Sequence, residues 1–378
     1  MADANEKKGK KSGRKVRVQF RSNRSRPSRT KDWTRQHRAG DDIEVSASES
    51  VVAKGHLSRK RTVIESDEPQ EGLIPGTVVA LRGQFAEVDD GKRLWPCTVR
   101  RILRTRSIGE RFPVTVGDRV RFRVVADGPG VQAEGVVVVV EPRQSELRRL
   151  AGRRVQVIAA NVDQVLIVSS ADLPPPKPHL IDRYIVSALA GGMTPVICMN
   201  KIDLDADGRA RDVTHRYGLL GYPVLPCSAL TGEGVDELRR LLHARSTVLA
   251  GQSGVGKSSL LNVIQPGLRL RVGGISDETL KGRHTTTTAE LIRLEIDAYV
   301  VDTPGIRSFD VSMIPRGELE QYFAEFVPLV PDCKFPDCTH IPEIGCAVKR
   351  AVEDERIHPE RYESYVRMFE DRTEGGFA

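Results

Sequence analysis

The chain has 378 residues, with 58 Lys and Arg, 51 Asp and Glu, six cysteines and a formal net charge of +7. This length suffices for several small domains. No apolar run is long enough to cross a bilayer, which argues against a membrane-spanning protein. Without a signal peptide, the few cysteines argue against a disulfide-stapled secreted protein, so we expect a reducing compartment. We also expect a monomer.

Residues 1–72 are predicted to form a basic, disordered tail and linker. The first 40 residues hold 14 Lys and Arg against three acids, a net charge of +11, so residues 41–378 carry −4. Few apolar residues interrupt this charge, as is typical of disordered chains. We favour an arm that binds RNA phosphates with an affinity that falls as salt rises. A solubilising tail is the alternative. A presequence is disfavoured because the Lys-rich start lacks an amphipathic apolar face.

Residues 73–150 are predicted to form a small β-barrel of the OB-fold type, a common platform for single-stranded RNA. Five short strands, separated by turn signals, are expected at Thr77–Arg82, Gln84–Val88, Leu94–Ile102, Asp118–Val125 and Ala133–Glu141. Arginines near the third strand are candidate phosphate contacts: Arg93, Arg100, Arg101, Arg104 and Arg106. The aromatic residues Phe85, Trp95, Phe112 and Phe122 are expected mainly in the barrel core.

Residues 151–312 contain short motifs that predict an α/β nucleotide-binding domain. Asn200-Lys201-Ile202-Asp203 follows a strand-like run, and Ser228-Ala229 ends the next such run along the chain. In an N-K-x-D arrangement the Asp carboxylate accepts hydrogen bonds from N1–H and the exocyclic amine of guanine. Adenine lacks this donor pair and would leave the carboxylate unpaired. The two loops therefore predict GTP rather than ATP, which disfavours a P-loop ATPase or kinase.

A phosphate-binding loop follows at Gly251–Ser258, with the pattern G-x-x-x-x-G-K-[ST] between a strand-like and a helix-like run. Its backbone N–H groups and the helix N-terminus should hold the phosphates. Lys257 should reach the β- and γ-phosphates, and the Ser258 hydroxyl should ligate Mg²⁺. The predicted GTP-binding residues are Asn200, Lys201, Asp203, Ser228, Ala229, Gly251, Gln252, Ser253, Gly254, Val255, Gly256, Lys257, Ser258, Ser259, Asp302 and Gly305.

Two switch segments are predicted downstream of the phosphate loop. Asp302-Thr303-Pro304-Gly305 closes a strand-like run, so Asp302 should hold the Mg²⁺ shell and Gly305 should contact the γ-phosphate. In the run Lys281–Thr288, we choose Thr286 as the second Mg²⁺ ligand, with Thr285 and Thr287 as alternatives.

The residue after Gly305 is Ile306, where Ras-like enzymes place the Gln that orients the attacking water. Isoleucine cannot hydrogen-bond water, so intrinsic hydrolysis should be slow. His284 is the candidate that positions the water, with a structural role in the switch as the alternative. The predicted catalytic residues are His284, Lys257 and Thr286.

Residues 313–378 are predicted to form an α-helical zinc-binding domain. One short segment holds a Cys₃His set: Cys333, Cys338, His340 and Cys346. Such a set is typical of a tetrahedral structural Zn²⁺ site, which we favour over chance clustering of these residues. Helices expected at Pro315–Phe326 and Glu360–Arg372 are too short for a large core, so the metal should supply folding energy. The other cysteines, Cys97, Cys198 and Cys227, are expected to be buried, inert thiols.

The base-reading motif precedes the phosphate loop, the reverse of the usual order, which predicts a circularly permuted G domain. This order, the Gly282–Thr287 segment and the D-T-P-G-I-R-S-F run at 302–309 resemble the RsgA (YjeQ) family of circularly permuted GTPases of small-ribosomal-subunit biogenesis. The likeness covers roughly residues 72–370, and the cysteine spacing also fits it. The basic tail lies outside the family core.

The resemblance implies a cytoplasmic enzyme with one structural zinc that binds GTP and GDP with Mg²⁺. It also implies docking on the small (30S) subunit and its 16S rRNA late in maturation, stimulation of hydrolysis there, and help in releasing the assembly factor RbfA. The alternative function is an RNA-binding scaffold that uses GTP only as a conformational sensor, which Ile306 would favour.

Overall fold

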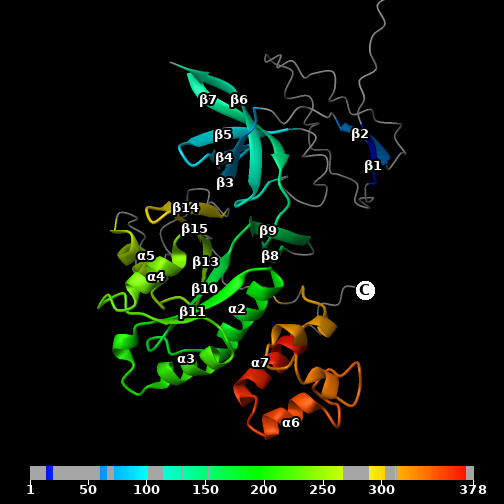
Figure 1. Ribbon diagram of the computed structural model, residues 1–378, viewed down its shortest axis with the longest axis vertical. Coiled ribbons are helices and arrows are strands. Elements are labelled where there is room, and N and C mark those ends of the chain that lie inside the picture. Colours follow the sequence, from blue (N-terminus) through cyan, green and yellow to red (C-terminus); the bar gives the residue numbers. More distant parts are fainter. Residues whose placement is uncertain are drawn as a thin grey trace, which may run out of the picture.

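Three folded parts follow one another along the chain: a barrel, a central sheet with helices, and a C-terminal module (Figure 1). The computed structural model describes residues 14–19, 60–65, 72–100, 114–128, 131–151, 154–266, 289–302, 311 and 313–371. The expected fold, a barrel followed by a P-loop α/β domain and short helices with a cysteine cluster, is therefore confirmed.

Two strands lie in the range expected to be disordered. Strands β1 (Arg14–Gln19) and β2 (Lys60–Glu65) pair antiparallel, with Val16 opposite Val63. Both carry β-branched residues, which suit extended backbone. The rest of the basic tail lies outside the described residues.

The barrel is closed by five strands: β3 (Ile74–Arg82), β4 (Phe85–Asp89), β5 (Leu94–Val99), β6 (Arg119–Gly128) and β7 (Val131–Val140). Their order is β3-β4-β5-β7-β6, and all neighbours are antiparallel except β5 and β7. This is the five-stranded Greek-key arrangement expected of an OB-fold. Trp95 and Phe122 are buried in its core, with ring centroids 5.5 Å apart, whereas Phe85 is exposed.

A hairpin that the sequence did not predict joins the barrel to the sheet. It consists of β8 (Glu146–Ala151) and β9 (Arg154–Ala160), which pair antiparallel. The Ala160 N–H donates to Val116 O at 2.8 Å. A Cβ at Gly117, whose φ is +87°, would lie 1.9 Å from Ala160 O, so this close approach requires glycine.

The central sheet has the order β12-β11-β10-β13-β15-β14 and is parallel except for β14. Its strands are β10 (Gln164–Ser170), β11 (Thr194–Asn200), β12 (Val224–Pro226), β13 (Ser246–Ala250), β14 (Glu290–Leu294) and β15 (Ala298–Asp302). Helices α2 (Pro178–Ala190) and α3 (Arg209–Leu219) pack in the apolar cluster of one face. Helices α4 (Val235–Leu242) and α5 (Lys257–Ile264) pack in that of the other. Burial on both faces explains the continuous apolar runs of the strands.

The C-terminal module packs beside α2 (Figure 1). It contains α6 (Ala347–Glu353), α7 (Pro359–Glu370) and the 3₁₀ turns η5 (Arg316–Glu318), η6 (Glu320–Tyr322) and η7 (Val330–Asp332). The helix expected over Pro315–Phe326 is wrong, because this segment forms two 3₁₀ turns that end at Phe323, which has extended backbone. This path buries Phe323 and Phe326 in the module core. The second expected helix corresponds to α7.

Among the described residues, no helix has the length and apolar character needed to cross a membrane.

Candidate functional site

The loop between β13 and α5 has a backbone that requires glycine. Gly251, Gly254 and Gly256 have φ values of +141°, +84° and +95°. A Cβ at Gly251 would lie 2.2 Å from Val168 O, and one at Gly256 would lie 2.3 Å from Asn200 Nδ2. The glycines therefore serve both the left-handed turn and close packing against the ends of β10 and β11. The loop leads directly into the first turn of α5, where Ser258 and Ser259 lie.

The Lys257 ammonium lies inside this loop. Its Nζ donates to Gly251 O at 2.8 Å and to Gln252 O at 2.6 Å. Burial lowers the pKa of Lys257. Loop carbonyls thus hold a half-buried cation at the position where loops of this sequence bind phosphate oxygens.

Asn200 connects three loops of the site. Its buried amide donates from Nδ2 to Val255 O at 2.8 Å, and its Oδ1 accepts from the Ala229 N–H at 3.1 Å. One side chain at the end of β11 therefore fixes the phosphate loop, 55 residues downstream, against the Ser228-Ala229 loop. The sequence placed Asn200 in the site but did not indicate this bridging role.

The Asp203 carboxylate is exposed and oriented by Ser228. The Ser228 hydroxyl donates to Asp203 Oδ1 at 2.5 Å, while its oxygen accepts from the Thr231 N–H at 3.1 Å. Lys201 has a φ of +60°, and its Nζ donates to the Leu173 carbonyl. The residues predicted to read the base thus lie together, with an exposed carboxylate acceptor held in a fixed orientation.

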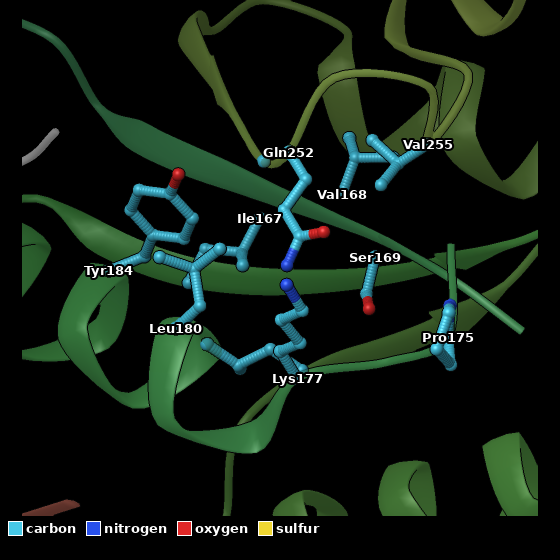
Figure 2. Close-up of a pocket in the computed structure, with 11 residues that line it drawn as sticks. Ile167, Val168, Ser169, Pro175, Lys177, Leu180, Tyr184, Gln252 and Val255 are labelled. Atoms are coloured by element: carbon cyan, nitrogen blue, oxygen red, sulfur yellow. The ribbon is translucent and has the colours of Figure 1, made fainter. Parts of the chain in front are cut away.

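A small cavity lies beneath the phosphate loop (Figure 2). Tyr184, Leu180 and Ile167 line it, and the side chains of Lys177 and Gln252 point toward one another across it. Its volume of about 10 Å³ has room for one water molecule at most. The cavity therefore belongs to the packing that supports the loop and is too small for a nucleotide.

The switch residues fall mostly outside the described part of the chain. Asp302 ends β15, where it is paired in register with Glu290. His284, Thr286, Gly305 and Ile306 lie outside the described residues, so their predicted roles stay predictions.

The arginines expected to contact RNA are described only in part. Arg93 stacks on Trp95, with Cζ 3.7 Å from the ring centroid, and its Nη2 lies 2.5 Å from Asp127 Oδ2. Arg100 follows β5. The other three, Arg101, Arg104 and Arg106, lie outside the described residues.

The four expected metal ligands converge in the C-terminal module. One ligand atom from each of Cys333, Cys338, His340 and Cys346 lies within 4.8 Å of the others. His340 Nδ1 is 3.6 Å from Cys333 Sγ and 3.4 Å from Cys346 Sγ, and the two sulfurs are 4.0 Å apart. Ligands of one tetrahedral Zn²⁺ would be separated by about 3.5–3.8 Å. The cluster therefore has the size of a single tetrahedral metal site.

Glu320 orients the histidine of this cluster. Its Oε2 lies 2.6 Å from His340 Nε2, so the Nε2–H bond to the carboxylate leaves the Nδ1 lone pair for a metal. The backbone of His340 is held by the Tyr362 hydroxyl, which donates to His340 O at 2.8 Å. No motif in the sequence pointed to Glu320, which lies 20 residues upstream. The remaining cysteines, Cys97, Cys198 and Cys227, are buried free thiols, as expected.

Comparison with known proteins agrees with this geometry. A family model described as RsgA GTPase matches residues 140–312. The small ribosomal subunit biogenesis GTPase RsgA of Chlorobaculum parvum is 43% identical over 268 residues, which cover 69% of this chain and 86% of that protein.

Two solved structures share the fold. YjeQ from Thermotoga maritima has a TM-score of 0.66 and 35% identity, over 80% of this chain and 100% of that one. YloQ, described as a circularly permuted GTPase, has a TM-score of 0.63 and 29% identity, over 86% of this chain and 100% of that one. The glycine loop, the base-reading loops upstream of it and these likenesses agree: the chain belongs to the RsgA family of circularly permuted GTPases and is a GTP hydrolase.

Proposed function

We propose that this chain hydrolyses GTP slowly by itself and faster on the small (30S) ribosomal subunit, late in subunit maturation. Docking would involve 16S rRNA, and the nucleotide cycle would help release RbfA from the subunit. The protein would act as a cytoplasmic monomer. The observation that carries the proposal is the Asn200 bridge between base-reading and phosphate loops, in a chain whose relatives are named small ribosomal subunit biogenesis GTPases.

The proposed nucleotide contacts follow from the geometry of the loops. Asp203, oriented by Ser228, would accept the N1–H and exocyclic amine of guanine. The N–H groups of 251–259 would hold the phosphates, and Lys257 would exchange its loop carbonyls for phosphate oxygens. Mg²⁺ would be held by Ser258 and Thr286, with Asp302 holding its coordination shell. The ion would neutralise charge that develops on the phosphates. Gly305 would contact the γ-phosphate.

Slow intrinsic hydrolysis is proposed because Ile306 offers no hydrogen bond to water. In our proposal the His284 imidazole orients the attacking water once the subunit has ordered the first switch. Loss of such a group costs on the order of 10²-fold in rate. The contribution of the subunit would then be to complete the site.

We also propose that the cysteine cluster holds one structural Zn²⁺. Three thiols and an imidazole form a closed donor set of the kind that zinc prefers, and the observed separations fit a tetrahedral ion. His340 is buried and held by Glu320, as the ligands of structural sites usually are. The ion would stabilise a module whose helices are short.

The basic tail would add an electrostatic contact to RNA. Its net charge of +11 over 40 residues favours phosphate binding that weakens steeply with salt. The barrel, which has an OB-fold order, would supply a second RNA surface.

Single-turnover GTP hydrolysis with and without purified small subunits tests the proposal. We expect a slow rate alone and a clear increase on adding small, but not large, subunits. His284→Ala should bind GTP as tightly as the wild type and lose most of that increase. A rate that small subunits leave unchanged would instead support a scaffold that uses GTP as a sensor. Unchanged stimulation in His284→Ala would assign the water to another group.

A further inference from the structure

The hairpin of β14 and β15 joins the two switches. The segment 281–288 leads into β14 at Glu290, and the segment that follows Asp302 leaves β15. Glu290 and Asp302 are register partners, so both switches attach at the same end of the hairpin. Its turn, at Asp297 with a φ of +54°, forms the opposite end.

Among the described residues, an ion pair joins the barrel to the switch end. Arg82, the last residue of β3, places Nη1 2.5 Å from Glu290 Oε1. Arg82 Nε also lies 3.6 Å from Glu87 within the barrel. The Arg82–Glu290 pair is half exposed, with side-chain exposures of 49% and 36%.

The barrel contacts the turn end through a more buried set. The Tyr299 hydroxyl donates to Asp89 Oδ2 at 2.8 Å, and Arg293 Nη1 donates to Gly91 O at 3.1 Å. Arg293 Nη1 also lies 3.6 Å from Asp89 Oδ2, a side chain that is 5% exposed. The barrel therefore holds the hairpin at both ends, and β14 lies below β3 in Figure 1.

We propose that Arg82 is a positioning residue for GTP hydrolysis, acting through Glu290 on the Mg²⁺ end of the site. The register places an acidic residue opposite an acidic residue at the point where both switches attach. Like charges directly opposite across a strand pair destabilise it. The Arg82 guanidinium balances the Glu290 charge and so keeps this end of the hairpin paired. The inference rests on the proposed role of Asp302 in holding Mg²⁺.

The consequence is that a barrel residue tunes catalysis without contacting the nucleotide. A two- to fivefold loss of rate corresponds to about 0.4–1 kcal/mol, which lies within the range that an exposed ion pair contributes. The base loops and the phosphate loop are held by hydrogen bonds that involve neither Arg82 nor Glu290. We therefore expect weaker Mg²⁺ binding and lower kcat, with GDP affinity unchanged.

The test compares Arg82→Gln with Arg121→Gln in the full-length protein. Arg121 is a matched control, since its pair with Glu141 is 3.1 Å long, lies within the barrel and has side-chain exposures of 43% and 34%. Arg82→Gln should lower kcat about two- to fivefold, raise the Mg²⁺ concentration for half-maximal rate and leave the GDP Kd unchanged. Arg121→Gln should leave kcat, the Mg²⁺ dependence and the GDP Kd unchanged. Arg82→Lys, which keeps the positive charge, should keep most of the wild-type rate.

A second variant separates charge balance from a general loss of packing. Glu290→Gln in the Arg82→Gln background should recover the rate, because it removes the charge that Arg82 balances. A double variant as slow as Arg82→Gln, or an Arg82→Gln that matches Arg121→Gln, would overturn the inference. Asp302→Asn tests the premise separately. If this variant keeps the wild-type Mg²⁺ dependence, the proposed role of Asp302 is wrong. If it loses much of its activity while Arg82→Gln is unaffected, only the inference about Arg82 is wrong.

Discussion

The barrel and the C-terminal module are joined to the G domain by different kinds of polar contact. Both interfaces have an apolar part, since Val79 of β3 is buried with the sheet and Val186 of α2 is buried with the module. The barrel adds the half-exposed Arg82–Glu290 pair and the Asp89 contacts to the hairpin of β14 and β15. The module adds an ion network that is almost fully buried.

That buried network centres on Arg361 of α7. Its Nη1 donates to Asp182 Oδ1 at 2.5 Å and its Nε to Glu325 Oε1 at 2.7 Å, with side-chain exposures of 6%, 0% and 9%. Burial alone would lower the pKa of Arg361, but Asp182 and Glu325 outweigh it and raise the pKa. The Tyr217 hydroxyl of α3 also donates to Asp182 Oδ1, at 2.6 Å. The module is therefore fixed to α2 and α3 by a buried ion network, whereas the barrel contacts to the β14–β15 hairpin include a half-exposed ion pair.

Removal of the proposed metal should have the largest effect on this difference between the two interfaces. Chelation, or Cys346→Ser, should unfold residues 313–371, because structural zinc typically contributes about 10–16 kcal/mol of apparent binding energy. The G domain should still bind GDP, since its core clusters lie on the two faces of its own sheet. Hydrogen exchange measures both regions in one sample, and added Zn²⁺ should restore protection. A module that stays protected without metal, or holds iron, would contradict the zinc assignment.

Arg361→Ala tests the buried network alone. Removing one partner of a buried ion pair costs about 3–5 kcal/mol, because Asp182 would stay buried with only Tyr217. Arg367→Ala is the matched control on the same helix, where the pair with Glu363 is 3.3 Å long and both side chains are 62% exposed. Hydrogen exchange of α2 and α7 should show a large loss for the first variant and almost none for the second. Equal effects would mean that burial does not distinguish the two interfaces.

Tyr299→Phe tests the barrel contact. Loss of one hydrogen bond to the Asp89 carboxylate should cost about 1.5–3 kcal/mol, less than the loss of Arg361. Faster exchange should appear in β14, β15 and the end of β4, with the C-terminal module unchanged. Faster exchange in α7 instead would show that the two interfaces are not independent.

The same residue gives a smaller, pH-dependent effect. Burial, with the Asp89 hydrogen bond, raises the pKa of Tyr299 from 10.0 to about 12. Because the pKa is higher in the folded state, this stabilisation is complete below pH 10 and is lost as the pH rises toward 12. The difference in stability between the wild type and Tyr299→Phe should therefore shrink over that range. A difference that does not change with pH would contradict the Tyr299–Asp89 contact.

The local motifs could be predicted from the sequence because their spacing largely determines their geometry. The glycines of 251–256 specify a left-handed loop, and four ligands within one short segment specify a metal-sized cluster. The barrel was likewise predictable from alternating strands and turn signals. The domain boundaries, however, remain predictions.

Contacts between distant segments left no comparable signal. Asn200 bonds to Val255, Glu320 to His340, and Arg361 to Asp182, which lies 179 residues away. In the sequence, nothing distinguishes these polar residues from the many others that could have made such a contact. The hairpin of β8 and β9 was missed because its charged sequence does not alternate clearly. The expected helix over Pro315–Phe326 failed because packing of its aromatic residues outweighed helical propensity.

We propose that the base-reading segment upstream of the phosphate loop selects guanine through Asp203. Asp203→Asn tests it most directly in a competition between GTP and XTP. We expect a reversal toward XTP, with GTP binding weakened at least about tenfold, because one acceptor for the guanine donor pair becomes a donor. A variant that keeps the wild-type preference for GTP over XTP would contradict the guanine-reading role of Asp203.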